Sequence, residues 1–532
     1  MTLLAILAVV GLSGCAGAPP RAALASESPP PTEPVPATSV PPEEDFSLPP
    51  ADSAVAPAPA ECKISPLSSE PCGAGVPLEK LADALELSDW AARDRALAPL
   101  ESCEDIEPGL VRTLRVDLVP NFCADVWAEG YLAQQGASLR IDVRDALSGL
   151  ALSARLSRLA LSVPVLEGEV NRERFLEFFR GQLGRWIVEQ ARALYATAKL
   201  GAQLQGYGRG VVAVAAGVAD MRFVEAIRTA PLPVEIASDE ELRDVYFGQL
   251  DQALGPIKTR GRDGALVGLR RLAETGSLGG ARVVAARALL STLYGGRRID
   301  ALDELLLPEL PESPSGDAML RVAEHLPVFY SPFLLDPSHL EDEPFLRALS
   351  AKGIPSVFRK RLDRMALPYA ARDLYARVLL RLGQTYWLSA DFTRAASLLS
   401  AAPTPGAGTT PQAQLVGAVA TALQHGPKDA ADMMVRGPLL PDGVGNVAEL
   451  DRIAKSKSPV AGLAAYNAAY ILSLVPPVTD DGGYWSDVAR RFKKAVSMLK
   501  QPKHKALARR RAESARATAT AIRRRAPPKR LQ

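Results

Sequence analysis

Cysteine side chains are the groups in this sequence that best fit covalent chemistry, and Cys15 is the clearest case. It follows the small pair Ser13-Gly14, which lets the backbone extend into the active site of a processing enzyme, and Leu12 supplies an apolar anchor. These residues end an apolar run that starts at Leu3 and is too short to span a bilayer. The pattern therefore indicates that the Cys15 thiol is accessible to a processing enzyme.

The run Leu12-Ser13-Gly14-Cys15 resembles the lipobox of bacterial lipoprotein signals, although no Lys or Arg precedes it. The resemblance implies that residues 1–14 are a signal peptide and that diacylglycerol is attached to the Cys15 thiol. It also implies that the new amino terminus receives a fatty acid such as palmitate, and that the protein is anchored in the cell envelope and faces the periplasm. Since Ala16 stands where many inner-membrane lipoproteins have Asp, the resemblance favours the outer membrane over the inner one.

Four further cysteines remain after Cys15. An even number in an exported chain fits an oxidising compartment, so we expect up to two disulfides near the start of the folded region. Three pairings are possible, and four buried, reduced thiols are the alternative. No CxxC pair is present, which argues against a zinc ribbon or a thioredoxin-like redox site. The candidate disulfide residues are Cys62, Cys72, Cys103 and Cys123.

Motifs for the common catalytic chemistries are absent from the sequence. It contains no GxxxxGK[ST], GxSxG or HExxH motif. Among the four histidines, His339 stands near Glu341, Asp342 and Glu343, a group that fits either a metal patch or, as we prefer, a solvated acidic helix start. We therefore expect no cofactor, no metal and no enzymatic activity.

The composition is that of a globular protein, with 532 residues of which 47% are hydrophobic and 23% charged. The formal net charge is only +2, so the whole chain is not expected to bind nucleic acid. Residues 15–75 differ, because Pro, Ala, Ser and Glu dominate them. Such a composition cannot bury enough apolar surface to fold, so we predict a lipidated N-terminus and a disordered, Pro/Ala-rich tether over residues 15–75.

Helical patterns dominate the sequence after residue 75, and strand patterns are almost absent. Asn171 fits an N-cap before apolar residues that recur at three- and four-residue spacing from Phe175 to Leu194. Ser238 and Glu241 form a capping-box pattern at another helix start. These patterns predict an all-α fold.

The expected helical region divides into a helical domain over residues 76–236, helical repeats over residues 237–500, and a basic C-terminal helix or tail over residues 501–532. The best repeat runs from Leu379 to Pro403, with a turn expected at residues 389–391. Its helices are predicted to pack through Leu379, Leu382, Gly383, Tyr386, Ala395 and Leu399.

In order and spacing this unit resembles the tetratricopeptide repeat. The resemblance implies an irregular α-solenoid of tetratricopeptide-like hairpins after the Pro-rich linker. It also implies a concave surface that binds a segment of a protein partner.

The C-terminal stretch carries almost only positive charges, with Glu513 as the single acid between Lys503 and Arg530. It fits contact with anionic lipid or a cell-wall polymer, or, equally, a solubilising disordered tail. Aromatic residues for base stacking are missing, so nucleic acid is not an expected partner. The candidate anion-binding residues are Arg509, Arg510, Arg511, Arg523, Arg524 and Arg525.

Together these features predict a lipid-anchored scaffold or adaptor of the cell envelope, which binds protein partners through a helical-repeat surface. The alternative is an envelope hydrolase or cell-wall lyase whose active site the sequence does not disclose. A deep cleft with converging carboxylates would favour the enzyme, whereas a helical groove would favour the scaffold.

Overall fold

The computed structural model describes residues 47–65, 77–107, 109–168, 170–294, 299–310, 312, 316–400, 409–426, 446–477, 480 and 482–525. Within these residues every regular element is a helix, and the one β-type contact is an isolated bridge between Ser277 and Gly353. The prediction of an all-α fold is confirmed. No helix in the same part of the chain has the length and apolar character needed to cross a bilayer.

The helices of the first half are α2 (Pro77–Glu86), α3 (Trp90–Leu97), α4 (Leu110–Leu118), α5 (Ala124–Gln135), α6 (Ile141–Arg158), α7 (Arg172–Phe178), α8 (Gly184–Gln203), α9 (Gly206–Arg228), α10 (Val234–Ala237) and α11 (Glu240–Thr275). Those of the second half are α12 (Ala281–Tyr294), α13 (Ala318–His325), α14 (Ser331–Leu334), α15 (Glu343–Ser350), α16 (Ser356–Leu362), α17 (Tyr369–Tyr386), α18 (Ser389–Ser400), α19 (Pro411–Leu423), α21 (Ala448–Ala454), α22 (Ala461–Leu474), α23 (Gly483–Met498) and α24 (Pro502–Arg525).

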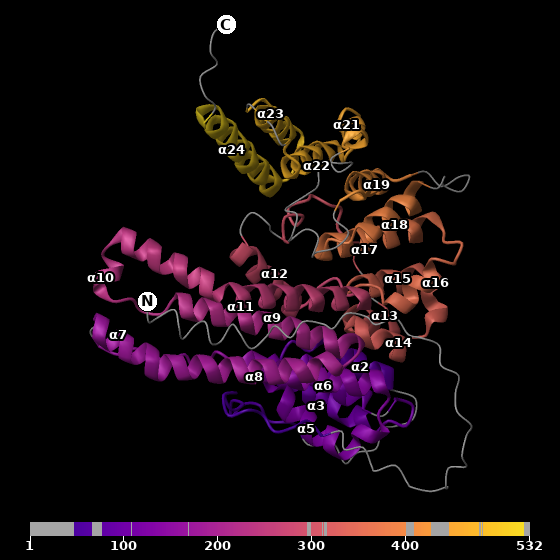
Figure 1. Ribbon diagram of the computed structural model, residues 1–532. Coiled ribbons are helices and arrows are strands. Elements are labelled where there is room, and N and C mark those ends of the chain that lie inside the picture. Colours follow the sequence, from indigo (N-terminus) through magenta and orange to yellow (C-terminus); the bar gives the residue numbers. More distant parts are fainter. Residues whose placement is uncertain are drawn as a thin grey trace, which may run out of the picture.

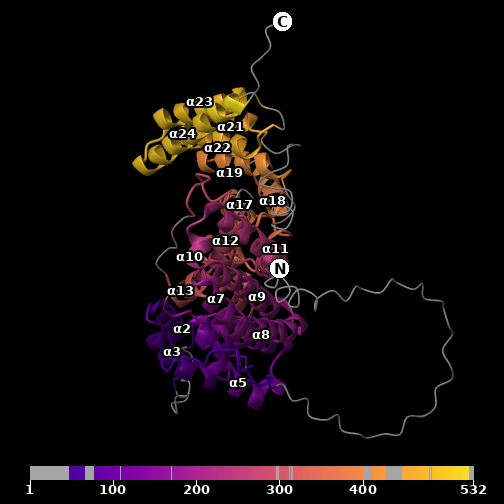
Figure 2. The same ribbon diagram turned by 60° about the vertical axis from the view of Figure 1, so that its left-hand side comes forward.

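The helices form an elongated stack with α2–α5 at one end and α21–α24 at the other, and α13 returns to pack beside α2 (Figures 1 and 2). One hydrophobic core runs through the stack from Cys62 to Ala515. A smaller core joins α7 and the start of α8 to α9 and α11. The expected boundary between residues 236 and 237 falls between α9 and α11, two helices that pack along each other and share the larger core.

Helix α9 is the centre of the first half, because it packs on α6, α8, α11 and α12. Glycines allow its backbone to touch its neighbours. A Cβ added to Gly208 would lie 1.9 Å from the carbonyl oxygen of Asp145 in α6, and one added to Gly217 would lie 2.4 Å from the backbone nitrogen of Ala265 in α11. Real Cβ atoms essentially never come so close, so the spacing of these helices depends on missing side chains.

Residues 47–65, the N-terminal strap, lie within the predicted disordered tether over residues 15–75, and for this part the prediction is wrong, because the strap packs on α6 and α8. The rest of the predicted tether lies outside the described residues. The strap has no regular secondary structure, yet buried side chains of α6 and α8 hold its main chain. Arg155 Nη1 donates to the carbonyl of Pro49 over 2.8 Å, Gln190 Nε2 to that of Ala54 over 3.1 Å, and Arg158 Nε to that of Ala56 over 2.8 Å. Composition suggested disorder because the strap offers few apolar side chains, but its carbonyls find donors.

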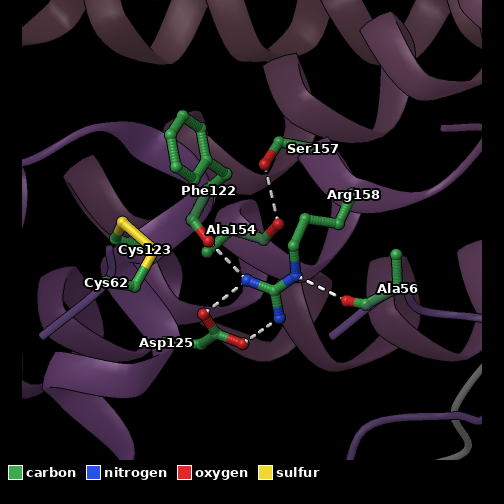
Figure 3. Close-up of a disulfide and its surroundings, with 8 residues drawn as sticks. All are labelled: Ala56, Cys62, Phe122, Cys123, Asp125, Ala154, Ser157 and Arg158. Atoms are coloured by element: carbon green, nitrogen blue, oxygen red, sulfur yellow. Dashed lines mark hydrogen bonds and ion pairs between the residues drawn. A yellow bond between two sulfur atoms is a disulfide. The ribbon is translucent and has the colours of Figure 1, made fainter. Parts of the chain in front are cut away.

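The arginines that hold the strap are themselves neutralised by acids, of which Asp125 is buried and Glu129 is partly exposed. Figure 3 shows Arg158 between the strap and Asp125, to which Nη1 donates over 2.7 Å. Arg155 pairs with Glu129 in the same way, with Nε donating over 2.9 Å. A buried guanidinium needs such a partner because burial of an unpaired charge costs several kcal/mol, on the order of the whole stability of a domain.

A disulfide joins Cys62, at the end of the strap, to Cys123, just before α5, with the two Cα atoms 5.1 Å apart (Figure 3). Cys103 is also disulfide-bonded, whereas Cys72 lies outside the described residues. The alternative of four reduced thiols is therefore wrong. With a sequence separation of 61 between its cysteines, the Cys62–Cys123 bond closes a loop whose chain entropy corresponds to a stabilisation of up to about 4 kcal/mol.

Two predicted helix starts have different outcomes. Asn171 caps α7 as expected, since its side chain accepts a hydrogen bond from the Arg174 amide over 3.0 Å. At α11 the expected cap was wrong by one residue: Asp239, not Ser238, accepts from the Leu242 amide over 3.0 Å. The Ser238 hydroxyl instead donates to the carbonyl of Val234 in the preceding helix α10. A carboxylate is the stronger acceptor for an amide at a helix start.

We predict that Gly208→Ala destabilises the fold by about 2–3 kcal/mol, because the new methyl group forces α6 and α9 apart. Gly248→Ala is the matched control: this glycine lies in α11 with no atom near its Cβ position among the described residues. It should gain about 0.5–1 kcal/mol from helix propensity. Urea unfolding followed by circular dichroism measures both, and equal stability of the two variants would contradict the tight α6–α9 contact.

Candidate peptide-binding groove

Residues 299–310, here called the groove segment, follow α12 and precede α13 in the chain, and they lie against α17, α22 and α24. The segment turns on itself up to Glu304 and has no regular secondary structure from Leu305 to Leu310. We call this second part its extended half, because both main-chain groups of Leu306 pair with one side chain, as extended backbone allows. Three of its apolar side chains, spaced by three residues, are buried in the main core: Ile299, Leu302 and Leu305.

One face of α17 binds the main chain of the groove segment. Trp387, which follows the last turn, donates from Nε1 to the Ile299 carbonyl over 2.5 Å. Gln384 Nε2 donates to the Leu302 carbonyl over 2.7 Å. Two arginines, one and two turns before Gln384, donate over 3.1 Å to carbonyls further along the segment: Arg381 to Pro308 and Arg377 to Glu309. Burial lowers the pKa of Arg381, whose hydrogen-bond partner is a neutral carbonyl and not a carboxylate.

Helix α22 binds the segment from the other side through Asn467, whose side chain is fully buried. Its Oδ1 accepts from the Leu306 amide over 2.8 Å, and its Nδ2 donates to the Leu306 carbonyl over 2.9 Å. The Tyr470 hydroxyl, one turn later, donates to the carbonyl of Ala301. A carboxamide that pairs with both main-chain groups of one residue recognises extended backbone whatever the side chain.

Charge in the groove complements the groove segment, which carries acids and no Lys or Arg. Arg287 of α12 pairs with Asp303 over 2.6 Å, and Arg511 of α24 pairs with Glu304 through Nε over 2.6 Å. The guanidinium of Arg511 also lies 5.2 Å from the centre of the Tyr470 ring. The groove therefore provides positive charge beside hydrogen-bond donors.

A cavity of about 770 Å³ continues the groove along the extended half of the segment. Its far wall comes from α19, α22, the end of α23 and the turn before α24, and it includes Gln412, Leu463, Met498 and Gln501. His504 lies at the same cavity, and burial together with Lys503 lowers its pKa. The cavity is thus open to a chain that approaches beside residues 305–309.

The predicted repeat unit supplies the wall that carries this site. A Cβ on Gly383 would lie 2.5 Å from the ring of Phe392 in α18, so the missing side chain lets α17 and α18 approach. Among the other residues predicted to pack these helices, Leu379, Leu382, Tyr386 and Ala395 are buried, and Leu399 is partly buried. The solenoid arrangement of the whole repeat region stays a prediction.

The turn of this unit was predicted at residues 389–391, and that position was wrong. Helix α18 already begins at Ser389, and the chain reverses at Trp387, whose φ of 56° is in the left-handed region. The cost of this conformation is offset by the indole, which is buried and bonded to the groove segment.

A second cavity, of about 520 Å³, lies between the two halves of the stack. Next to it, the carboxylate of Asp117 accepts hydrogen bonds from Tyr207 over 2.8 Å, from Tyr330 over 3.3 Å and from Arg282 over 2.7 Å. Burial raises the pKa of both tyrosines. At its mouth Glu107 and Asp142 both pair with Arg140. These carboxylates neutralise arginines, which suits a structural network better than acid–base catalysis.

The basic residues predicted to bind anions divide into two groups. Arg511 pairs with Glu304, and Arg523 donates to the Gly482 carbonyl over 3.1 Å and to the Ser486 hydroxyl over 2.7 Å. Helix α24 docks on α23 through Ala508, Ala512, Ala515 and Ala519. The residues left on its exposed face are Arg509, Arg510, Arg524 and Arg525.

Other predicted features take no part in the groove. Cys15 lies outside the described residues. His339 pairs with Asp342 over 3.1 Å at the start of α15, and no cluster of three possible metal ligands exists in the part of the chain that the structure describes. Sequence reasoning missed the groove segment, although Asn467 in an otherwise apolar helix was a usable signal.

Comparisons with known proteins give no further assignment, since no family model, no curated protein and no solved structure matches the chain.

The buried carboxyl of Asp391, in the first turn of α18, gives a prediction for pH. Burial raises its pKa to about 6, and Oδ2 has no hydrogen-bond partner among the described residues. Ionisation thus costs more in the folded state, a penalty present above pH 6 and lost as the pH falls towards 4. Asp391→Asn should therefore stabilise the fold by about 1–3 kcal/mol at pH 7.5 and by little at pH 4.

Asp487→Asn serves as the control of opposite sign, because the hydrogen bond from Arg490 lowers the pKa of Asp487. This variant should lose stability at pH 7.5 and not at pH values below the native pKa. Urea unfolding at pH 7.5 and pH 4 tests Asp391→Asn, and a third measurement below the lowered pKa of Asp487 tests the control. A loss of stability in Asp391→Asn at pH 7.5 would show that its carboxylate is stabilising.

Proposed function

We propose that this protein is a lipid-anchored scaffold of the cell envelope that binds an extended segment of a partner protein in the groove between α17, α22 and α24. The observation that carries the proposal is the groove itself: side chains from α17 and α22 bind the main chain of the groove segment, and Arg511 of α24 pairs with the carboxylate of its Glu304. Such donors recognise peptide backbone, and arginines beside them select acidic segments.

The groove supports the scaffold over an envelope hydrolase or cell-wall lyase. A hydrolase needs converging carboxylates or a nucleophile aimed at free space, whereas the groups of the groove that bind the segment are amide, indole, phenol and guanidinium donors. Those groups bind carbonyls and do not transfer protons at neutral pH. Of the acids at the adjoining cavity, Asp303 is paired with Arg287. The proposal accordingly has no cofactor and no chemical step.

The anchor and location in this proposal come from the lipobox resemblance at residues 12–15. Acyl chains on Cys15 would hold the protein at the membrane, in the outer membrane rather than the inner one, with the helical stack in the periplasm. Two or more acyl chains give stable attachment. The exposed arginines of α24 would add contact with anionic lipid or a cell-wall polymer, and nucleic acid is not an expected partner.

The anchor predicts fatty-acid labelling at Cys15. Radiolabelled palmitate should enter the wild-type protein in a bacterial host and be absent from Cys15→Ala, which should also leave the membrane fraction. Cys103→Ala is a control that removes a different cysteine, and it should retain the label. Unchanged labelling of Cys15→Ala would remove the anchor from the proposal.

The binding role predicts site-specific photo-crosslinking in cells. A benzophenone amino acid at Gln412 or Gln501, which lie on different elements of the 770 Å³ cavity, should give the same discrete adduct with an envelope protein. Tyr195, 64% exposed on α8, is the control position and should not give that adduct. Adducts from all three positions alike, or from none, would count against a binding groove.

A further inference from the structure

The groove segment is bound as a peptide ligand is bound. Side chains of the groove satisfy the carbonyls of Ile299, Ala301, Leu302, Leu306, Pro308 and Glu309. In a helical protein most main-chain groups are satisfied within helices, so a run of carbonyls that depends on foreign side chains is unusual. The segment combines buried leucines, an extended half and acidic residues that pair with the groove.

We propose that residues 299–310 are an intramolecular ligand that occupies the partner site, and that the partner supplies a segment of the same chemistry. This inference rests on the proposed function. The partner segment has apolar side chains at three-residue spacing, acids beside them, and an extended stretch that follows. When the partner binds, its main chain replaces that of the groove segment and accepts hydrogen bonds from the same donors.

The exchange is physically feasible because each lost hydrogen bond is replaced by an equivalent one. The acids of the groove segment are also only partly buried, with Asp303 46% and Glu304 36% exposed. Ion pairs of that exposure hold weakly. The 770 Å³ cavity runs beside the extended half, so an incoming chain has room to start pairing before the groove segment leaves.

An intramolecular ligand lowers the apparent affinity for any external peptide, because the site is free for only a fraction of the time. Weakening the groove segment without altering the groove should therefore raise peptide affinity. Leu306→Pro does this, since it removes the N–H group that donates to Asn467 Oδ1 and changes no residue of the groove. Leu307→Pro is the matched control, because the Leu307 amide is not the one that Asn467 binds.

The probe is a fluorescein-labelled synthetic peptide of residues 299–310, and binding to the full chain is measured by fluorescence anisotropy. We expect Leu306→Pro to bind the peptide at least about tenfold more tightly than wild type and Leu307→Pro to be close to wild type. The double variant Leu306→Pro/Asn467→Ala should lose the gain, and a peptide that itself carries the Leu306→Pro change should not bind.

A charge exchange provides a second variant that does not involve proline. Glu304→Arg places two arginines together, so it should release the groove segment and admit the wild-type peptide. Adding Arg511→Glu restores the internal pair and reverses the charge that the peptide meets. The double variant Glu304→Arg/Arg511→Glu should therefore bind the wild-type peptide as weakly as the wild-type protein does, or more weakly.

The proposal is overturned if Leu306→Pro and Glu304→Arg are folded by circular dichroism and neither gains peptide affinity. It is also overturned if both variants unfold, because the segment is then part of the core and not a replaceable ligand. Crosslinking from Gln412 and Gln501 does not depend on this peptide. A partner adduct without peptide binding would therefore reject the intramolecular ligand and keep the scaffold.

Discussion

Irregular backbone can be buried in a helical protein only if side chains supply the hydrogen bonds that helices make for themselves. Two segments of this chain meet that constraint in the same manner. Arg155, Arg158 and Gln190 satisfy carbonyls of the N-terminal strap, and Gln384 and Asn467 satisfy those of the groove segment. Long donors on helix faces thus bind peptide backbone at both ends of the stack, and the strap is in addition tied by a disulfide.

The two segments differ in what surrounds them. At the strap, each arginine is paired with a buried or half-buried acid of a neighbouring helix, so its charge is neutralised without the strap. At the groove, Arg287 and Arg511 are paired with acids of the segment itself. Removal of the groove segment would leave these guanidinium groups without those carboxylates, which favours an acidic replacement. The same kind of backbone binding is therefore structural in one place and fit for exchange in the other.

Helical periodicity was sufficient to predict the all-α fold and the Asn171 cap, because both depend on the local spacing of residues, which the sequence shows directly. The Gly383–Phe392 approach could be anticipated for a similar reason, since a small residue must stand where two helices meet. The positions of the strap and the groove segment could not be anticipated, because they depend on donors 50 to 169 residues away in the sequence. Composition alone made residues 47–65 resemble a tether, and Asp239 replaced Ser238 as cap through a difference of one position.

An empty groove would have a physical cost for this protein. Asn467 is fully buried, and with nothing bound its oxygen and nitrogen would lose their partners, while apolar surface now covered by Leu302 and Leu305 would meet water. Occupation by the chain's own segment removes both costs and also sets a threshold for exchange. A competitor must match the leucine spacing, the extended backbone and the acids together, since a segment that supplies one of these features alone leaves donors unpaired. Selectivity in such a groove comes from the ligand that it already holds.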